Sequence, residues 1–412
     1  MTVLIVFLCP FAVRGVALPQ EVTVDTLAGG RIVVTNPSRT QGGGSVGWRL
    51  VEDLRLGRVE GSGPDIFAEI RDIAVGENGL IYVLDVGWKE VRVFSREGRY
   101  LRRMARAGGG PGEKRYGSRI DQDVVWQAPN RLWVGDGRQQ LSLDSLGNEL
   151  HRSDRRAGFW PGNVPIWGRV IDADTLGFVY KEVTLVDYRT PDRDYLRHTY
   201  AVRHSVSGDH ELLAGDTLLI ETRFVTMGPP ESSTTEDGRG ELIMSWPSFM
   251  APQQFVWGFG SVGTLWVAHR SAYRFHEVTF DRDTVRTVAL GDPAPVANDA
   301  GGESGFEPII AALDVSPEGW LWVRRESAGP EAGATWDLFD NCGRYRGEVG
   351  TPVRLGAIEH PRGLLGPRVP LEIAADGVVL GIVSDALGVD SVIRLRLQSA
   401  AGTRVARETC LF

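Results

Sequence analysis

A unit of four short strands that recurs along the chain limits the fold more than any other feature of the sequence. Its clearest copy runs from Ile70 to Arg106 and contains four apolar-alternating runs, IRDIAV, LIYVLD, EVRVFS and RYLRRM. The clusters GENG, VGWK and REG separate these runs and are typical of tight turns. Four antiparallel strands joined in this way form one blade of a β-propeller.

The turn and second strand of this unit return five more times. The further copies begin at Ala128, Asp172, Gly260, Ser316 and Ala374. The spacing of the copies is that of a blade plus a linker, except between the third and fourth copies, where it is nearly doubled. The excess falls near residues 221–252, whose Pro, Gly, Ser and acidic residues predict an inserted exposed loop. We therefore predict an all-β, six-bladed propeller with an insertion, while a seventh, degenerate blade stays open in this interval.

Ring closure requires a strand from outside the last unit. That unit supplies only three strands, PLEIAA, VVLGIV and SVIRLRL, and an unpaired edge would remain. The segment from Val46 to Gly57, VGWRLVEDLRLG, alternates like an outer strand and precedes the first full blade. We expect this N-terminal strand to close the ring, although the tail TRVARETC competes for the same place.

The glycine-rich stretch AGGGPGEK, from Ala107 to Lys114, invites comparison with a phosphate-binding loop. Such a loop needs Gly-Lys-Ser/Thr between a buried strand and a helix, so that helix N-terminal amides face the anion. Here Arg115 follows the lysine and no helical periodicity follows. A similar stretch, GRVEGSGPDIF, lies at residues 57–67, also between two units. Both stretches are predicted to be linkers between blades.

The N-terminus differs from the rest of the chain. An apolar stretch from Val3 to Val13 is too short to span a bilayer and is typical of a secretory signal peptide with cleavage after Ala17. We expect residues 1–17 to be this signal, residues 18–45 to be an N-terminal extension and residues 46–412 to be a single propeller domain. The protein is then secreted or periplasmic and has no transmembrane segment.

Charge and cysteine content narrow the class of partner. The net charge of −8 argues against a nucleic-acid partner, because such surfaces need a clustered excess of Lys and Arg. Cys342 and Cys410 are the only cysteines outside the signal, and in an oxidising compartment they would either form a disulfide that holds the C-terminal tail or remain two free thiols. We expect a monomer.

These patterns together resemble a known family. An outer strand W-x-L is followed by I-x-D-I-A-V-x-x-x-G-x-I-Y-V-L-D, by V-x-V-F-S-x-x-G-x-Y-L-R and by G-G-G-P-G-E, between Trp48 and Glu113. This combination is similar to bacterial six-bladed β-propeller proteins related to NHL-repeat proteins. The resemblance implies a disc of six blades that is often exported and often without an assigned activity.

Acidic residues fall in the predicted inner strands, which line the channel of a propeller. Asp72, Asp123, Asp314 and Glu372 are the candidates, and a ring of carboxylate oxygens would suit calcium. The alternative is a set of solvated acids without a metal. The seven histidines share no equivalent place in the repeat, which argues against a zinc or catalytic cluster.

Tryptophans divide into two groups. Trp133, Trp266 and Trp322 occupy one position of the repeated LWV motif and are predicted to pack between blades. Trp160 and Trp167 flank PGNVPI in a predicted linker and are the candidates for a binding contact at the rim.

Two functions remain open at this point. We favour an exported, non-catalytic scaffold that binds a protein, peptide or glycan ligand. The alternative is a metal-dependent hydrolase or lyase, similar to propeller lactonases, with its site in the central channel. Fold alone does not choose between them.

Overall fold

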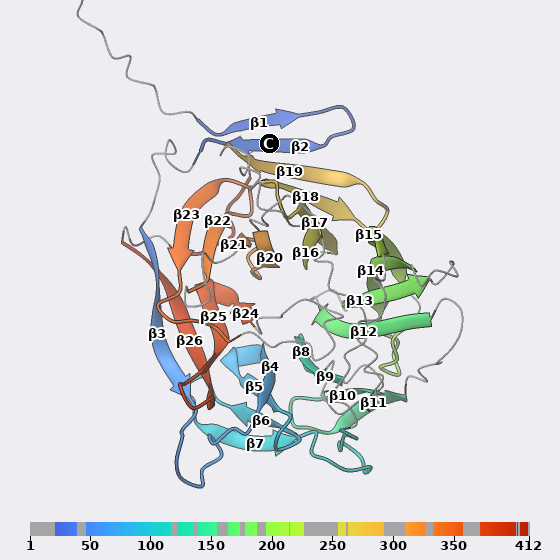
Figure 1. Cartoon of the computed structure of the whole chain (residues 1–412), viewed down its shortest axis with the longest axis vertical. Coiled ribbons are helices and arrows are strands. Elements are labelled where there is room, and N and C mark those ends of the chain that lie inside the picture. Colours follow the sequence, from blue (N-terminus) through green and yellow to red (C-terminus); the bar gives the residue numbers. More distant parts are fainter. Residues whose placement is uncertain are drawn as a thin grey trace, which may run out of the picture.

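The computed structural model describes most of the predicted repeat region. The described residues are 21–38, 47–116, 122–135, 139–154, 164–173, 178–187, 195–213, 215–225, 254–260, 263–291, 310–325, 333–356, 371–400, 402 and 404–410. They form six sheets of mainly antiparallel strands arranged in a ring, with β4, β8, β12, β16, β20 and β24 nearest the centre (Figure 1). The chain is a six-bladed β-propeller, as the repeat and the resemblance to NHL-like proteins predicted.

The first three blades follow one another along the chain. Blade 1 contains β4 (Ile70–Val75), β5 (Ile81–Asp85), β6 (Glu90–Phe94) and β7 (Tyr100–Met104). Blade 2 contains β8 (Asp123–Gln127), β9 (Arg131–Gly135), β10 (Gln139–Leu143) and β11 (Glu149–Asp154). Blade 3 contains β12 (Val164–Ala173), β13 (Phe178–Asp187), β14 (Tyr195–Ser205) and β15 (Asp216–Val225). The strands of blade 3 are about twice as long as those of blades 1 and 2.

The other three blades complete the ring. Blade 4 contains β16 (Phe255–Phe259), β17 (Thr264–His269), β18 (Arg274–Thr279) and β19 (Thr284–Leu290). Blade 5 contains β20 (Ile310–Val315), β21 (Leu321–Arg325), β22 (Thr335–Phe339) and β23 (Tyr345–Gly350). Blade 6 contains β24 (Leu371–Ala374), β25 (Val378–Ser384), β26 (Asp390–Ser399) and β3 (Trp48–Leu56). Single 3₁₀ turns, Glu77–Gly79 and Ala375–Gly377, join the first two strands of blades 1 and 6.

The N-terminal strand β3 closes the ring, as predicted. It pairs antiparallel with β26 from Trp48, opposite Ser399, to Leu56, opposite Val392. This pairing makes β3 the outermost strand of blade 6, immediately before the chain enters blade 1 (Figure 1). Backbone hydrogen bonds between the two ends of the repeat array therefore complete the sixth sheet.

The N-terminal extension adds a feature that the sequence did not predict. Its strands β1 (Thr23–Thr26) and β2 (Ile32–Asn36) form a hairpin, and β2 pairs in parallel with β19, so that the sheet of blade 4 has six strands (Figure 1). Asn36, 1% exposed, ends β2 and donates to the carbonyl of Gly343 in blade 5 at 2.9 Å. The hairpin thus connects two neighbouring blades.

Apolar packing between blades explains why the ring holds together. Among the described residues, the buried apolar side chains form six clusters, and each cluster lies between two neighbouring blades. Trp133, Trp266 and Trp322 are at most 3% exposed and lie in three of these clusters, in agreement with their predicted role. Each blade therefore covers the apolar faces of its neighbours.

The glycine-rich stretch is a linker between blades 1 and 2, and most of its amides have partners within the chain. The Glu113 carboxylate accepts from the Gly110 amide at 2.9 Å, and Glu149 accepts from the Gly112 amide at 2.7 Å. Lys114 is fully buried, with its ammonium 4.3 Å from the centroid of the Tyr116 ring. Carboxylates of the chain thus accept hydrogen bonds from amides that a bound phosphate would need as donors.

Several sequence predictions fall on residues that the structure does not describe. The signal sequence lies among them, and so does the insertion, apart from residues 221–225, which end β15. The domain limits 18–45 and 46–412 remain predictions. The described segments include no helix with the length and hydropathy needed to cross a membrane.

Candidate functional site

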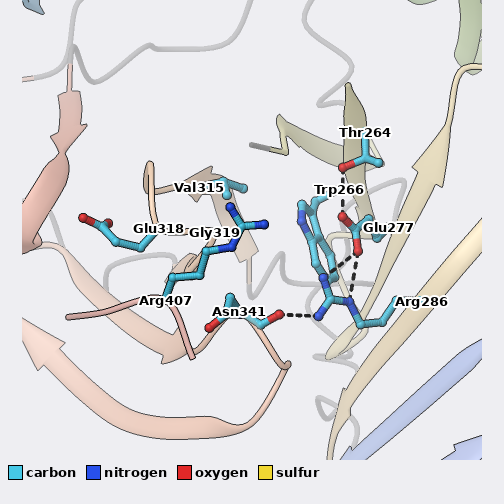
Figure 2. A pocket seen from close by; sticks show the side chains of 9 residues that line it. All are labelled: Thr264, Trp266, Glu277, Arg286, Val315, Glu318, Gly319, Asn341 and Arg407. Carbon is cyan, nitrogen blue, oxygen red and sulfur yellow. Dashed lines mark hydrogen bonds and ion pairs between the residues drawn. The ribbon is translucent and has the colours of Figure 1, made fainter. Parts of the chain in front are cut away.

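A cavity of about 360 Å³ lies between blades 4 and 5 (Figure 2). We call it the interblade pocket. It is lined by Thr264, Trp266, Glu277, Arg286, Val315, Glu318, Gly319, Asn341 and Arg407. The blade residues lie at or near two turns of each blade, the turn between the first and second strands and the turn between the third and fourth strands. Arg407 belongs to the C-terminal tail, residues 404–410.

Blade 4 supplies a rigid, charge-neutral wall. Trp266, Glu277 and Arg286 lie directly opposite one another on β17, β18 and β19. The Arg286 guanidinium donates to Glu277 at 2.7 and 2.9 Å and lies 5.2 Å from the Trp266 ring centroid. Thr264 donates its hydroxyl hydrogen to the other oxygen of Glu277 at 2.8 Å (Figure 2). Arg286 also donates to the carbonyl of Asn341 in blade 5, which joins the two walls.

Blade 5 contributes the turn between β20 and β21. Gly319 has a φ of +86°, in the left-handed region that favours glycine, and its amide closes the turn by donating to the Ser316 carbonyl at 2.8 Å. Glu318 precedes it and accepts from the amide of Asp376 in blade 6 at 2.8 Å. Its other carboxylate oxygen is buried. The turn is therefore held by its own backbone and by the next blade.

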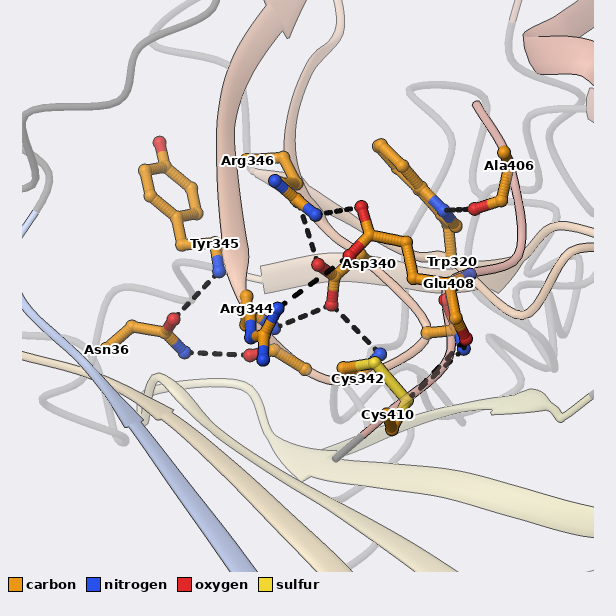
Figure 3. A network of polar contacts seen from close by, with 12 residues as sticks. Asn36, Trp320, Asp340, Cys342, Arg344, Tyr345, Arg346, Ala406, Glu408 and Cys410 are labelled. Carbon is orange, nitrogen blue, oxygen red and sulfur yellow. Dashed lines mark hydrogen bonds and ion pairs between the residues drawn. A yellow bond between two sulfur atoms is a disulfide. The ribbon is translucent and has the colours of Figure 1, made fainter. Parts of the chain in front are cut away.

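The C-terminal tail forms the third side of the pocket. Val405 is 8% exposed and packs into the apolar cluster between blades 5 and 6. The Trp320 indole donates to the Ala406 carbonyl at 2.9 Å (Figure 3). The Asn341 side chain accepts from the amide of Glu408 and donates to its carbonyl, both at 2.8 Å. Arg407 stands between these two fixed residues and points into the pocket (Figure 2).

A disulfide and a charged network fix the end of the tail. Cys410 is bonded to Cys342, which lies in the turn between β22 and β23. The Asp340 carboxylate accepts from the Cys342 amide at 2.9 Å and from the Arg346 guanidinium at 2.8 Å (Figure 3). Arg346 pairs in turn with Glu408 of the tail. The tail is thus held by covalent, ionic and apolar contacts, all of them to side chains of blade 5 or to the adjacent core.

One titratable group close to this site faces away from it. Burial lowers the pKa of His276, and the charges of Arg274 and Arg31 lower it further. The imidazole is therefore uncharged at neutral pH. His276 adjoins Glu277 on β18 and so lies on the opposite face of the sheet, where it contacts Thr287 at 3.0 Å.

The acids predicted to line the channel have other surroundings. Asp72 and Asp123 are each 1% exposed, so the expectation of solvated acids is wrong for this pair. Asp72 accepts from the Val124 amide of blade 2 and from the Ile73 amide, both at 3.0 Å, and so joins two inner strands. Asp314 and Glu372 are half-buried on β20 and β24.

The structure does not bring these four acids into a metal site. Among the residues that it describes, no three His, Cys, Asp or Glu side chains form a group suited to a metal ion. Calcium binding in the channel therefore stays a prediction. Of the two predicted rim tryptophans, Trp160 lies outside the described residues, and the structure places only the backbone of Trp167, in β12.

Sequence reasoning missed the interblade pocket. In its blade 4 wall, Thr264 and Trp266 occupy alternate positions of GTLWVAH, a pattern that by itself predicts only packing between blades. Arg407 has a weaker signal, since the sequence of the tail is also compatible with a closing strand. The position of Arg407 three residues before Cys410 is the one sequence feature that indicates a fixed place for it.

The fold and this pocket together define the class of protein, a six-bladed propeller with a side-chain-lined site between two blades. The sequence matches no protein-family model and no curated protein. Solved structures with a similar fold include a member of the DUF4221 family from Bacteroides vulgatus, 10% identical, with a TM-score of 0.46 over 86% of this chain and 99% of that chain.

Two further similar structures are a catalytically inactive variant of a lyase and a calcium-binding protein. Virginiamycin B lyase from Staphylococcus aureus is 9% identical, with a TM-score of 0.40 over 85% of this chain and 100% of that chain. Regucalcin from Agrobacterium tumefaciens, a calcium-binding protein, is 12% identical, with a TM-score of 0.33 over 80% and 92%. The assignment of the fold rests on the six sheets themselves, and these proteins lend no activity to this chain.

Proposed function

We propose that the chain is an exported, non-catalytic binding scaffold whose interblade pocket receives a group of a protein, peptide or glycan ligand. The observation that carries this proposal is the construction of the pocket. Blade 4, blade 5 and the C-terminal tail each supply a wall, and hydrogen bonds or ion pairs within the chain hold the side chains of the first wall in place. Preorganised side chains lose little conformational entropy when a ligand binds.

The disulfide supports the proposed export. Disulfides persist in oxidising compartments and are rare in the cytosol. The bond between Cys342 and Cys410 holds a tail that forms part of the pocket, so an oxidising environment would keep the site assembled. This agrees with the apolar N-terminal segment expected to act as a signal peptide.

Ligand capture by the full mature protein tests the proposal. The immobilised protein is exposed to an extracellular fraction and to peptide and glycan arrays, in parallel with two variants. Val315→Trp fills the pocket, whereas Val285→Trp adds the same side chain to an exposed position of β19 outside it. We expect Val315→Trp to lose at least about tenfold in affinity and Val285→Trp to bind normally. Equal binding by both variants would contradict the proposal.

The metal-dependent hydrolase or lyase remains the competing hypothesis, and metal analysis separates it from the scaffold. A stoichiometric divalent ion that disappears in Asp123→Asn would favour the enzyme. Asp72→Asn is a poor reporter by itself, because Asp72 also holds the Val124 amide and its loss weakens the contact between blades 1 and 2.

A further inference from the structure

We infer that the interblade pocket binds a carboxylate group carried by a peptide, and that Arg407 of the C-terminal tail pairs with this carboxylate. The inference rests on the proposed function and deepens it, because it names the chemistry of the ligand. Three observations carry it. Arg286 is bonded within the chain whereas Arg407 is not, the charged groups of the lining balance, and the tail is fixed on both sides of Arg407.

Of the two arginines in the pocket, Arg407 is the one whose charge is available to pair with a ligand. Within the described part of the chain, its guanidinium makes no hydrogen bond or ion pair, and the residue is exposed. Arg286, in contrast, pairs with Glu277 through two hydrogen bonds and donates a third to the Asn341 carbonyl. A guanidinium presents its donors in a planar fork that fits the two oxygens of a carboxylate.

The charge of the lining favours a monoanion. Arg286 and Glu277 neutralise each other, and the lining also includes one negative charge on Glu318 and one positive charge on Arg407. One oxygen of Glu318 accepts from the Asp376 amide, and the other is buried away from solvent. A single carboxylate would use the free guanidinium, whereas a dianionic phosphate would bring two charges to a lining with no net positive charge.

The aromatic residue of the pocket favours a peptide over a sugar acid. Trp266 is 3% exposed, and the Arg286 guanidinium lies 5.2 Å from its ring centroid. The pocket therefore offers no open aromatic face for a sugar ring. A peptide carboxylate with an apolar side chain fits the remaining surface, to which Val315 and Gly319 contribute.

The disulfide positions Arg407. The backbone on both sides of Arg407 is bonded to blade 5, through Trp320 before it and Asn341 after it, and Cys410 is tied to Cys342 three residues further on. An arginine on a free tail would lose more backbone and side-chain entropy when it pairs with a ligand. We therefore expect carboxylate binding to weaken when the disulfide is opened.

Isothermal titration of the full mature protein tests the inference. The probes are N-acetylated tripeptides with an apolar last residue, such as acetyl-Gly-Gly-Leu, in free-acid and amide forms, together with glucuronate and inorganic phosphate. We expect the free acid to bind at least about tenfold more tightly than the amide, because a charged hydrogen-bonded pair is lost in the amide. Equal affinities, tighter binding of glucuronate or phosphate, or no binding of any free-acid peptide would overturn the inference.

Variants identify the residue responsible. Arg407→Gln should abolish the preference for acid over amide, and Arg404→Gln, which removes the same charge from an exposed position of the same tail outside the pocket, should retain it. Paired serine substitutions at Cys342 and Cys410 should lower the affinity for the acid while the far-ultraviolet circular dichroism stays that of a propeller. Preference for the acid in Arg407→Gln would overturn the inference.

The two proposals fail in distinguishable ways. If Val315→Trp loses its captured ligand while Arg407→Gln retains it, the pocket binds ligands but not through this carboxylate contact. If neither variant affects capture, the scaffold proposal fails as well.

Discussion

The two ends of the chain are fastened to the propeller by different kinds of bond. At the N-terminal end, β3 joins the sheet of blade 6 through an antiparallel ladder with β26 that is interrupted by one register shift between Arg394 and Leu395. At the C-terminal end, the tail crosses blade 5 without joining a sheet and is held by side chains and a disulfide. The first fastening closes the ring, whereas the second builds one wall of a pocket. The comparison separates what stabilises the fold from what shapes the site.

The largest loss of stability is expected when the contacts of the N-terminal strand β3 are weakened. Trp48, 7% exposed, starts β3, packs edge-on against Trp320 at 6.0 Å and donates to the Arg346 carbonyl at 2.9 Å. Trp48→Ala should lower the free energy of unfolding by about 3–5 kcal/mol, the range for large buried aromatic residues. Urea unfolding measures the change. Trp88→Ala, at a site that is 57% exposed, serves as the control, and equal losses in both variants would show that β3 does not stabilise the ring.

Loss of the disulfide should cause the second-largest decrease in the free energy of unfolding. Paired serine substitutions at Cys342 and Cys410 should cost about 2–4 kcal/mol, because the bond closes a long loop of 68 residues in the unfolded chain. Denaturant unfolding of the oxidised wild-type protein and of the double variant provides the comparison. An unchanged midpoint would mean that the tail is held without help from the disulfide.

The hairpin provides an intermediate case, since it joins a sheet and also uses a side chain. Asn36 donates to Gly343 and accepts from the Tyr345 amide at 2.8 Å, and it is 1% exposed. Asn36→Ala should cost about 1–3 kcal/mol, because it leaves buried partners without a hydrogen bond. Thermal unfolding measures this loss. Asn148→Ala, in an exposed turn of blade 2, is the matched control and should cost less.

The smallest loss of stability is expected from removing a charge between β3 and β26. Burial raises the pKa of Asp53 on β3, but hydrogen bonds from Arg394 and Arg396 on β26 outweigh it, so that the pKa lies below the usual value of 3.8. A carboxyl group with a lowered pKa stabilises the fold above its unfolded value, and this contribution disappears as the pH falls. Asp53→Asn should therefore cost less than about 1 kcal/mol at pH 7.

The pH dependence supplies the check for Asp53. The difference in stability between wild-type and Asp53→Asn should shrink as the pH falls from 6 through 3.8 and below, as followed by urea unfolding at each pH. A difference that stays constant across this range would show that the pairing with Arg394 and Arg396 does not stabilise the folded state.

The same comparison explains which parts of the structure the sequence predicted. The blade from Ile70 and the closing strand from Val46 to Gly57 were identified because alternation and turn residues are local signals, and β3 (Trp48–Leu56) lies within the predicted segment. Asn36 contacts a residue 307 positions away, and the parallel pairing of β2 with β19 leaves no local pattern. The hairpin was therefore expected only as an extension.

The candidate site was less accessible to sequence reasoning. Asp72 has the residue type and the position of a channel ligand, yet its carboxylate is used by the backbone of the next blade. Arg407 has no repeat partner, and its place depends on Trp320 and Asn341, far from it in the chain. Local patterns identify strands, but the ends of a chain that dock through side chains are fixed by contacts that no periodicity encodes.

Hydrogen exchange with mass spectrometry, on oxidised and reduced protein under native conditions, tests most directly whether the two ends have separate roles. Reduction should deprotect the tail, residues 404–410, and the turn around Asn341, because both depend on the disulfide. The amides of β3 and β26 should keep their protection. Loss of protection in β3 on reduction, or a tail that stays protected without the disulfide, would contradict the account.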